Sequence, residues 1–244
     1  MIALVIIAVA FGAFSQRATG MGLALVASPV LLLVLEPITA VILINLCGIV
    51  SGLLIAARTW RYVDWHRYRQ IGLAAVIGAI PGTIILLVLP SSWLKIGIGG
   101  ILIVSLLLST LTRRTENEVD GLAIRVGFGL AFGFIGSSAA VGGPAISVYA
   151  ILSRWKQQSF AATMQPLLLT IAGVSVLSKV IIDPASWPNL DWREWAGIAF
   201  GLAAGLATGD ALSSRIKPSH ARLAVVIVAY LGAAAAIVKG LTSL

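Results

Sequence analysis

The sequence predicts an all-α polytopic membrane protein with two inverted repeats, each a broken-helix hairpin followed by three transmembrane helices. The 244 residues are 59% hydrophobic and only 11% charged, whereas soluble domains carry about 25% charged residues. Long apolar segments also recur along the whole chain and leave no room for a sizeable soluble domain. One membrane domain covering residues 1–244 is therefore expected.

Six apolar segments are long enough to cross a bilayer as helices, three of them in each half of the chain. A helix needs about 20 residues to span roughly 30 Å of hydrocarbon. The six segments comprise residues 38–57, 71–90, 93–111, 160–182, 195–214 and 221–238.

Two further apolar regions are each interrupted by small and polar residues. Residues 1–35 are too long for one span and are broken at 16–22 by QRATGMG. Residues 122–152 are broken at 136–144 by GSSAAVGGP. Non-helical backbone at membrane depth is tolerated only where protein or a water-filled cavity satisfies its polar groups. We expect each region to form two short helices joined at a glycine-rich elbow.

The two halves of the chain share landmarks that indicate an internal duplication. The segment WRYVDW begins at Trp60, and WPNLDW begins at Trp187, which is 127 residues (187 − 60) further on. Gly78 and Gly205 are separated by the same interval. Internal repeats of this kind are typical of secondary transporters. The predicted repeats comprise residues 1–112 and 121–244.

The charges of equivalent loops predict that the repeats are inverted. Residues 58–70 hold four arginines and one aspartate, whereas residues 183–194 hold three acidic residues and one arginine. Cytoplasmic loops favour Arg and Lys, so the first loop is expected inside and the second outside. Inversion requires an odd number of crossings in each half. The three spanning helices of each half supply this number if the hairpin enters and leaves the membrane on the same side. The chain is then expected to cross the cell inner (plasma) membrane several times, with both termini on the outer side.

A binding site for an anion is expected where the two elbows meet near the membrane midplane. Short helices that point their N-termini there would present free N–H groups and positive dipole ends. Arg17 would add a fixed charge, and an arginine inside the membrane costs at least ~3 kcal/mol on insertion scales. The candidate substrate-binding residues are Gln16, Arg17, Thr19, Gly20, Gly22, Asn45, Ser137, Ser138, Gly142, Gly143 and Gln165.

Each candidate has an alternative structural role. Arg17 would snorkel to lipid headgroups if its hairpin is shallow, and the small residues of the elbows would serve tight helix packing. Asn45 and Gln165 would link helices through hydrogen bonds, and Gln16 would cap a helix. Outside the candidate set, Lys179 is expected to pair with Asp183 on the exterior side.

An enzymatic function is not indicated. His66 and His220 both fall at loop edges, so neither a Ser/His pair nor a histidine metal cluster is expected within the membrane. The middles of the spans lack carboxylates that would relay protons, and no phosphate-binding loop for ATP is present. We therefore expect no catalytic residues, no metal and no cofactor.

The net charge of +8 has a simple explanation in the basic loops. It does not require a nucleic-acid partner. The expected partners are a small anionic substrate and the lipid bilayer, and a homo-oligomer remains open.

Several stretches together resemble the TauE/SafE family of sulfite and organosulfonate exporters, also called the toluenesulfonate uptake permease group. They are QRATGMGLALVASP, the basic loop with VDW, and GFIGSSAAVGGPAISVYAIL in the second half. The first elbow has Thr19-Gly20-Met21-Gly22 where the family commonly has a glycine triplet. The resemblance implies transport of small oxyanions such as sulfite, sulfoacetate or sulfonates.

The sequence and the resemblance together suggest a secondary transporter or facilitator, with export as the expected direction. Its substrate would be a small sulfur-containing oxyanion such as sulfite or an organosulfonate, bound at a midplane site between the repeats. The alternatives are a non-transporting membrane scaffold or assembly subunit, and a transporter of another small solute. The choice of anion and the coupling are left open.

Overall fold

The computed structural model describes the backbone of residues 2–19, 23–111, 118–212 and 218–243. Side chains are described for the same residues except 17–19, 109–111, 212 and 218–225. Within this part of the chain there are ten α-helices and no strands, which confirms the all-α fold class.

The helices follow one another along the chain with short connections. In order they are α1 (Ile2–Thr19), α2 (Leu23–Val34), α3 (Pro37–Thr59), α4 (Trp65–Val88), α5 (Ser91–Leu111), α6 (Leu122–Ala139), α7 (Gly143–Leu152), α8 (Gln157–Ile182), α9 (Trp192–Leu212) and α10 (Pro218–Leu241). Single 3₁₀ turns, η1 (Trp60–Tyr62) and η2 (Pro184–Ser186), follow α3 and α8.

The helices α3, α4, α5, α6 and α8 are long and apolar enough to cross a membrane. Large apolar side chains such as Leu73, Val88, Ile181 and Phe200 are more than 70% exposed on the outer surface. Lipid tails can cover such a surface, whereas its exposure to water would be unfavourable in free energy. The chain is thus a multi-pass membrane protein.

Each broken region forms a long helix followed by a short one, which corrects the expectation of two short arms. The first helices, α1 and α6, have 18 residues each and are about 27 Å long. The second helices, α2 and α7, have 12 and 10 residues and reach only about 18 and 15 Å. Only the returning arm of each hairpin is short.

The second elbow is visible in detail. The helix α6 ends because Ala140 adopts a left-handed conformation, with φ 60° and ψ 12°, and donates its N–H to the Gly136 carbonyl at 3.0 Å. Pro144 in the first turn of α7 suits a helix start, where its missing N–H costs nothing. Gly142 lies so close to Phe132 that a Cβ atom would come within 2.6 Å of the ring. The chain therefore folds back tightly against α6.

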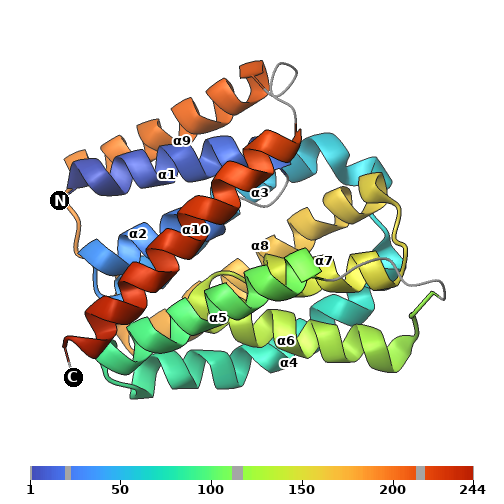
Figure 1. Ribbon diagram of the computed structural model, residues 1–244, viewed down its shortest axis with the longest axis horizontal. Helices are drawn as coiled ribbons and strands as arrows, with labels where there is room; N and C mark the ends of the chain where they lie inside the picture. Colours follow the sequence, from blue (N-terminus) through green and yellow to red (C-terminus); the bar gives the residue numbers. More distant parts are fainter. Residues whose placement is uncertain (1, 20–22, 112–117, 213–217, 244) are drawn as a thin grey trace.

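Helices from the two halves pack against one another. The helix α1 lies along α9, α4 along α6, α3 against α8, and α5 against α10 (Figure 1). Small residues bring the backbones together: a Cβ on Gly133 of α6 would lie 1.8 Å from the Ala75 carbonyl oxygen of α4. A Cβ on Gly205 of α9 would lie 2.1 Å from the Ala10 carbonyl oxygen of α1.

The central helices α3 and α8 run antiparallel. Asn45, in the first half of α3, bonds to Ser175 near the end of α8, whereas Gly52 further along α3 contacts Leu169. The helices α5 and α10 are also antiparallel, because the start of α5 lies beside the end of α10.

The two hairpins open toward opposite ends of the molecule. In Figure 1 the start of α1, the end of α2 and the end of α10 lie at the left. The start of α6 and the end of α7 lie at the right, together with the α3–α4 connection. The α3–α4 connection, which belongs to the arginine-rich segment 58–70, lies at the right, and the α8–α9 connection, which belongs to the acidic segment 183–194, lies at the left.

A charged network at the right-hand end holds α4, α6 and α7 together. Asp120 accepts two hydrogen bonds from the Arg125 guanidinium, at 2.9 and 2.7 Å, and one from Arg67 at 2.8 Å. The Tyr149 hydroxyl donates to the same carboxylate at 2.7 Å. The Arg125 bond, with smaller effects from Tyr149, the Gly121 N–H and Arg67, holds the pKa of Asp120 below its usual range although partial burial opposes this. The network fixes the base of the second hairpin.

Candidate functional site

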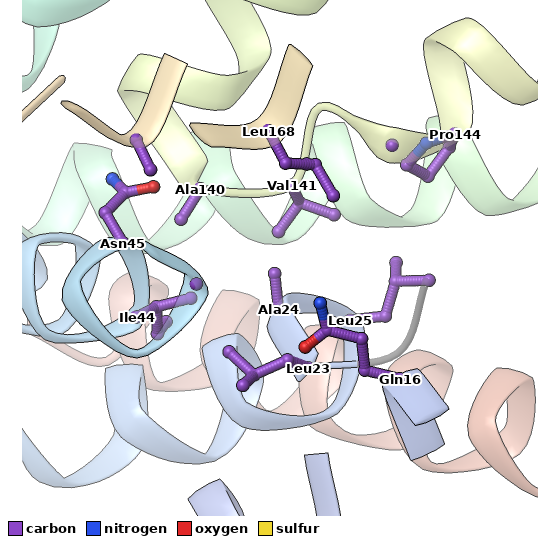
Figure 2. A pocket seen from close by; sticks show the side chains of 13 residues that line it. Gln16, Leu23, Ala24, Leu25, Ile44, Asn45, Ala140, Val141, Pro144 and Leu168 are labelled. Atoms are coloured by element: carbon purple, nitrogen blue, oxygen red, sulfur yellow. The ribbon is translucent and has the colours of Figure 1, made fainter. Parts of the chain in front are cut away.

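A cavity lies between the start of α2 and the second elbow. The centres of water-sized molecules can occupy about 60 Å³ of it, and ~10–15 Å³ measured in this way is enough to hold one water molecule. Figure 2 shows α2 residues facing the second elbow across it. The lining residues are Gln16 of α1, Leu23, Ala24 and Leu25 of α2, Ile44, Asn45 and Gly48 of α3, Ala140, Val141, Gly143 and Pro144 of the second elbow and α7, and Leu168 and Ala172 of α8.

Both short helices begin at this cavity. Leu23 is the first residue of α2, and Gly143 is the first residue of α7. The first N–H groups of a helix have no partner within it, and the helix dipole places a partial positive charge at the same end. Two such ends at one cavity favour an anion.

Gln16 is the lining residue contributed by α1. It is buried, and its amide oxygen accepts a hydrogen bond of 3.0 Å from the Ser51 hydroxyl of α3. This bond fixes the amide so that its nitrogen, a donor, is turned toward the cavity (Figure 2). The side chain is therefore placed to donate to a bound anion.

Asn45 reaches the same cavity from α3. Its amide nitrogen donates to the Ser175 hydroxyl of α8 at 2.9 Å, in a fully buried hydrogen bond. The residue therefore joins the two central helices and lines the cavity as well. The two roles that the sequence suggested for Asn45 are compatible.

Four other predicted residues are buried close by but do not line the cavity. The hydroxyl of Ser137 donates to the Ala79 carbonyl at 2.9 Å, and that of Ser138 donates to the Phe134 carbonyl at 2.7 Å. Gln165 donates through its nitrogen to a carbonyl of its own helix, and its buried oxygen has no partner among the described residues. Gly142 packs against α6.

The first elbow lies largely outside the described residues. Arg17 and Thr19 belong to the last turn of α1, but their side chains lie outside the described residues. Gly20 and Gly22 lie wholly outside them. The proposed roles of these four residues remain predictions. Of the candidates, Gln16, Asn45 and Gly143 are brought together at the cavity.

Lys179 is a buried cation whose surroundings the sequence did not reveal. Its side chain is fully buried on α8, and its ammonium donates to the Ser137 carbonyl at 2.8 Å and to the Ser175 hydroxyl at 2.5 Å. The expected pair with Asp183 is wrong. The Asp183 carboxylate instead accepts from the Ala185 N–H and the Ser186 hydroxyl in the turn that follows α8.

A sequence signal for this part of the site exists in the spacing along α8. Leu168, Ala172, Ser175 and Lys179 follow one another at intervals of three or four residues, so they share one face of the helix. The apolar lining residues carry no such signal, because they resemble the rest of the membrane core.

Of three comparisons with known proteins, one gave a match, and it includes both hairpins and the cavity between them. Neither the curated proteins nor the solved structures gave a match. A family model described as sulfite exporter TauE/SafE matches residues 4–236, which include all of the cavity-lining residues and nearly the whole chain. With this match across an all-helical, multi-pass fold, the chain belongs to the sulfite exporter TauE/SafE family.

Proposed function

We propose that the protein is a secondary transporter or facilitator that binds a small sulfur-containing oxyanion, such as sulfite or an organosulfonate, in the cavity between its hairpins. Membership of the family implies membrane transport of sulfite or related anions. The observation that carries the assignment to this cavity is the convergence of two helix N-termini, those of α2 and α7, on one cavity.

The lining suits an oxyanion that carries a small organic group. Backbone N–H groups at the two helix starts and the Gln16 amide nitrogen provide donors, while the other lining side chains are mostly apolar. Apolar walls exclude water, and hydrogen bonds to charge are stronger in such surroundings. Arg17, in the last turn of α1, would supply a fixed positive charge.

We infer further that residues 1–112 and 121–244 are inverted repeats. The packing of the helices supports this. The helix α1 packs on α9, and α6, which corresponds to α1 in the second half, packs on α4, which corresponds to α9 in the first half. Equivalent helices that face each other, α3 with α8 and α5 with α10, run antiparallel. Repeats of the same orientation would place such helices parallel.

Single contacts point to the same relation. Gly78 packs on the Leu130 carbonyl, and Gly205 packs on the Ala10 carbonyl. The two glycines lie 127 residues apart (205 − 78), and the two carbonyls lie 120 apart (130 − 10). One close contact between backbones therefore recurs between corresponding helices of the two halves, which supports the duplication.

Inverted halves suggest how the site would be exposed to each side in turn. In transporters built this way, one half rocks against the other around a site near the bilayer midplane. The arginine-rich end of the molecule would face the cytoplasm. A membrane potential that is negative inside favours anion export by ~2.3 kcal/mol per charge per 100 mV, so no coupling ion is required.

The scaffold alternative makes a different structural prediction. A scaffold or assembly subunit would pack its hairpins in dry contact, because nothing would need to enter between them. The cavity at the starts of both short helices, which has room for a few water molecules, favours a transporter.

The test is flux of sulfite and of a small sulfonate in proteoliposomes with an imposed membrane potential. Wild type should release either anion faster than protein-free vesicles, and faster when the loaded side is negative. Arg17→Ala should lower the rate at subsaturating substrate by roughly tenfold or more, the range of a lost hydrogen bond to charge. The control Arg61→Ala removes an exposed loop arginine and should behave as wild type.

Two results would contradict the proposal at different levels. Wild-type vesicles that move neither anion would remove the transport assignment. Normal flux in Arg17→Ala would remove only Arg17 from the site.

A further inference from the structure

We propose that Lys179 is a second cation of the anion site, which acts on the substrate through Ser175 and Asn45 and favours doubly charged anions. This inference rests on the proposed anion transport. It concerns a residue outside the cavity lining, so Lys179 is a positioning and selectivity residue that does not itself contact substrate.

Among the residues whose side chains the structure describes, no carboxylate pairs with the ammonium of Lys179. It donates three hydrogen bonds, to the Ser137 carbonyl at 2.8 Å, the Ser175 carbonyl at 3.2 Å and the Ser175 hydroxyl at 2.5 Å. In the described part of the chain none of its contacts is an ion pair. A buried charge inside a membrane is costly unless it is paired or used. A bound anion would supply the missing counter-charge.

The charge is connected to the cavity by two hydrogen bonds. A lysine ammonium can only donate, so the Ser175 hydroxyl accepts from Lys179 and directs its own proton elsewhere. The same hydroxyl lies 2.9 Å from the Asn45 amide nitrogen, and Asn45 lines the cavity. Lys179 therefore fixes the orientation of a polar group that faces the substrate and places its charge close behind that group.

The position of Lys179 also answers an electrostatic problem of the hairpin. At the elbow the carbonyl end of α6, which carries partial negative charge, lies beside the N–H end of α7. Without compensation the first would repel the anion that the second attracts. Lys179 binds the Ser137 carbonyl in the last turn of α6 and offsets this negative end.

The first hairpin has a basic residue at the corresponding place. Arg17 lies in the last turn of α1, and Ser137 lies in the last turn of α6, 120 residues further on (137 − 17). The carbonyl end of α6 has the cation of Lys179 from α8 beside it, and Arg17 would give the carbonyl end of α1 a cation of its own. Two cations suit a dianion better than a monoanion, because the Coulomb attraction scales with the charge of the ligand.

The alternative role for Lys179 is structural capping of α6, which needs hydrogen-bond donors but no preference for ligand charge. The two roles differ in anion selectivity. Two substrates of similar size can separate these roles. One is sulfite at a pH where it is a dianion, and the other is methanesulfonate, which is a monoanion.

The experiment uses the full chain in proteoliposomes and measures KM and maximal rate for both anions. Lys179→Met removes the charge at similar length and should raise the KM for sulfite by about tenfold or more, with a distinctly smaller change for methanesulfonate. Lys179→Arg should restore most of the preference for sulfite. Lys95→Met, which removes a buried lysine of α5 that does not line the cavity, should keep the wild-type preference.

A second variant covers the case in which Lys179→Met does not fold. Ser175→Ala keeps the lysine and its bond to the Ser137 carbonyl but removes the hydroxyl that links it to Asn45. It should also lower the preference for sulfite, while its thermal stability in detergent stays near that of wild type.

The possible outcomes separate the two proposals. Equal changes for both anions, or an unchanged ratio in every folded variant of Lys179 and Ser175, would overturn the role of Lys179 and leave anion transport intact. Wild-type protein that transports neither anion would overturn the proposed function, and this inference with it.

Discussion

A methyl group on Gly133 would collide with the backbone of the neighbouring helix. A Cβ built there lies 1.8 Å from the carbonyl oxygen of Ala75 and 2.6 Å from its carbon. The obstacle is main chain, so it cannot rotate aside as a side chain can. To reach an ordinary contact, α6 would have to move away from α4 by roughly 1.5 Å along its closest approach.

The cost follows from comparing Gly133→Ala with the same substitution in open space. Overpacking in a tight interior costs about 1–3 kcal/mol and occasionally more. Gly97 on α5 is exposed, and a Cβ added there would have nothing within 4 Å, so alanine at this position should gain up to about 1 kcal/mol of helix propensity. The two variants, which make the same chemical change, should differ by about 1–4 kcal/mol in unfolding free energy.

The assay is reversible unfolding in mixed micelles, followed through the fluorescence of the seven tryptophans. Gly133→Ala should unfold at a lower denaturant fraction than wild type, and Gly97→Ala at an equal or higher one. If Gly133→Ala proves as stable as Gly97→Ala, the close contact of α4 with α6 is absent from the folded protein.

Two further predictions concern the charged network and the cavity. Asp120→Asn should lower the unfolding free energy by about 1–3 kcal/mol, because Arg67 and Arg125 lose their shared acceptor. The pKa of Asp120 is depressed in the folded state, so its contribution to the unfolding free energy is complete above the unfolded pKa of about 4 and is lost as the pH falls through the folded pKa. Thermal melts from neutral to acidic pH should therefore show the stability of wild type converging on that of Asp120→Asn. A difference that stays constant with pH would contradict this. Ala24→Phe should fill the cavity and abolish sulfite flux while the protein still folds. The control Ala3→Phe, on the exposed surface of α1, should leave sulfite flux unchanged. Normal flux in Ala24→Phe would mean that the substrate passes elsewhere.

The sequence was sufficient for the class of protein and for the position of the hairpins. Backbone groups in lipid are satisfied only within helices or closed barrels, and continuous apolar segments of about 20 residues, without the alternation of barrel strands, favour helices. Glycine, serine and proline near 16–22 and 136–144 interrupt the apolar regions, and such residues end helices wherever they cluster. The lengths of the arms were less predictable, because glycine and serine are accommodated within α6 up to Ala139 by close packing on α4.

Part of the candidate site was also accessible from sequence. The sequence singles out polar and small residues of the elbows and polar residues of the helices that follow them; Gln16, Asn45 and Gly143 meet this criterion, and all three line the cavity. Ser137 and Ser138 met the same criterion, yet their hydroxyls bond to backbone carbonyls. Residue type identifies a polar group in an apolar region, but it does not tell which neighbour takes the hydrogen bond.

By itself, then, the sequence determined that this chain lies in a membrane and where its helices break, since hydrophobicity and backbone preference act over a few neighbouring residues. The tertiary structure decided which groups meet. Lys179 lies four residues from Asp183 along the chain, yet it bonds to Ser137, 42 residues away, because packing of α8 against α6 brings that carbonyl to the buried ammonium. Partners of this kind depend on how distant helices pack together, and no local pattern records that.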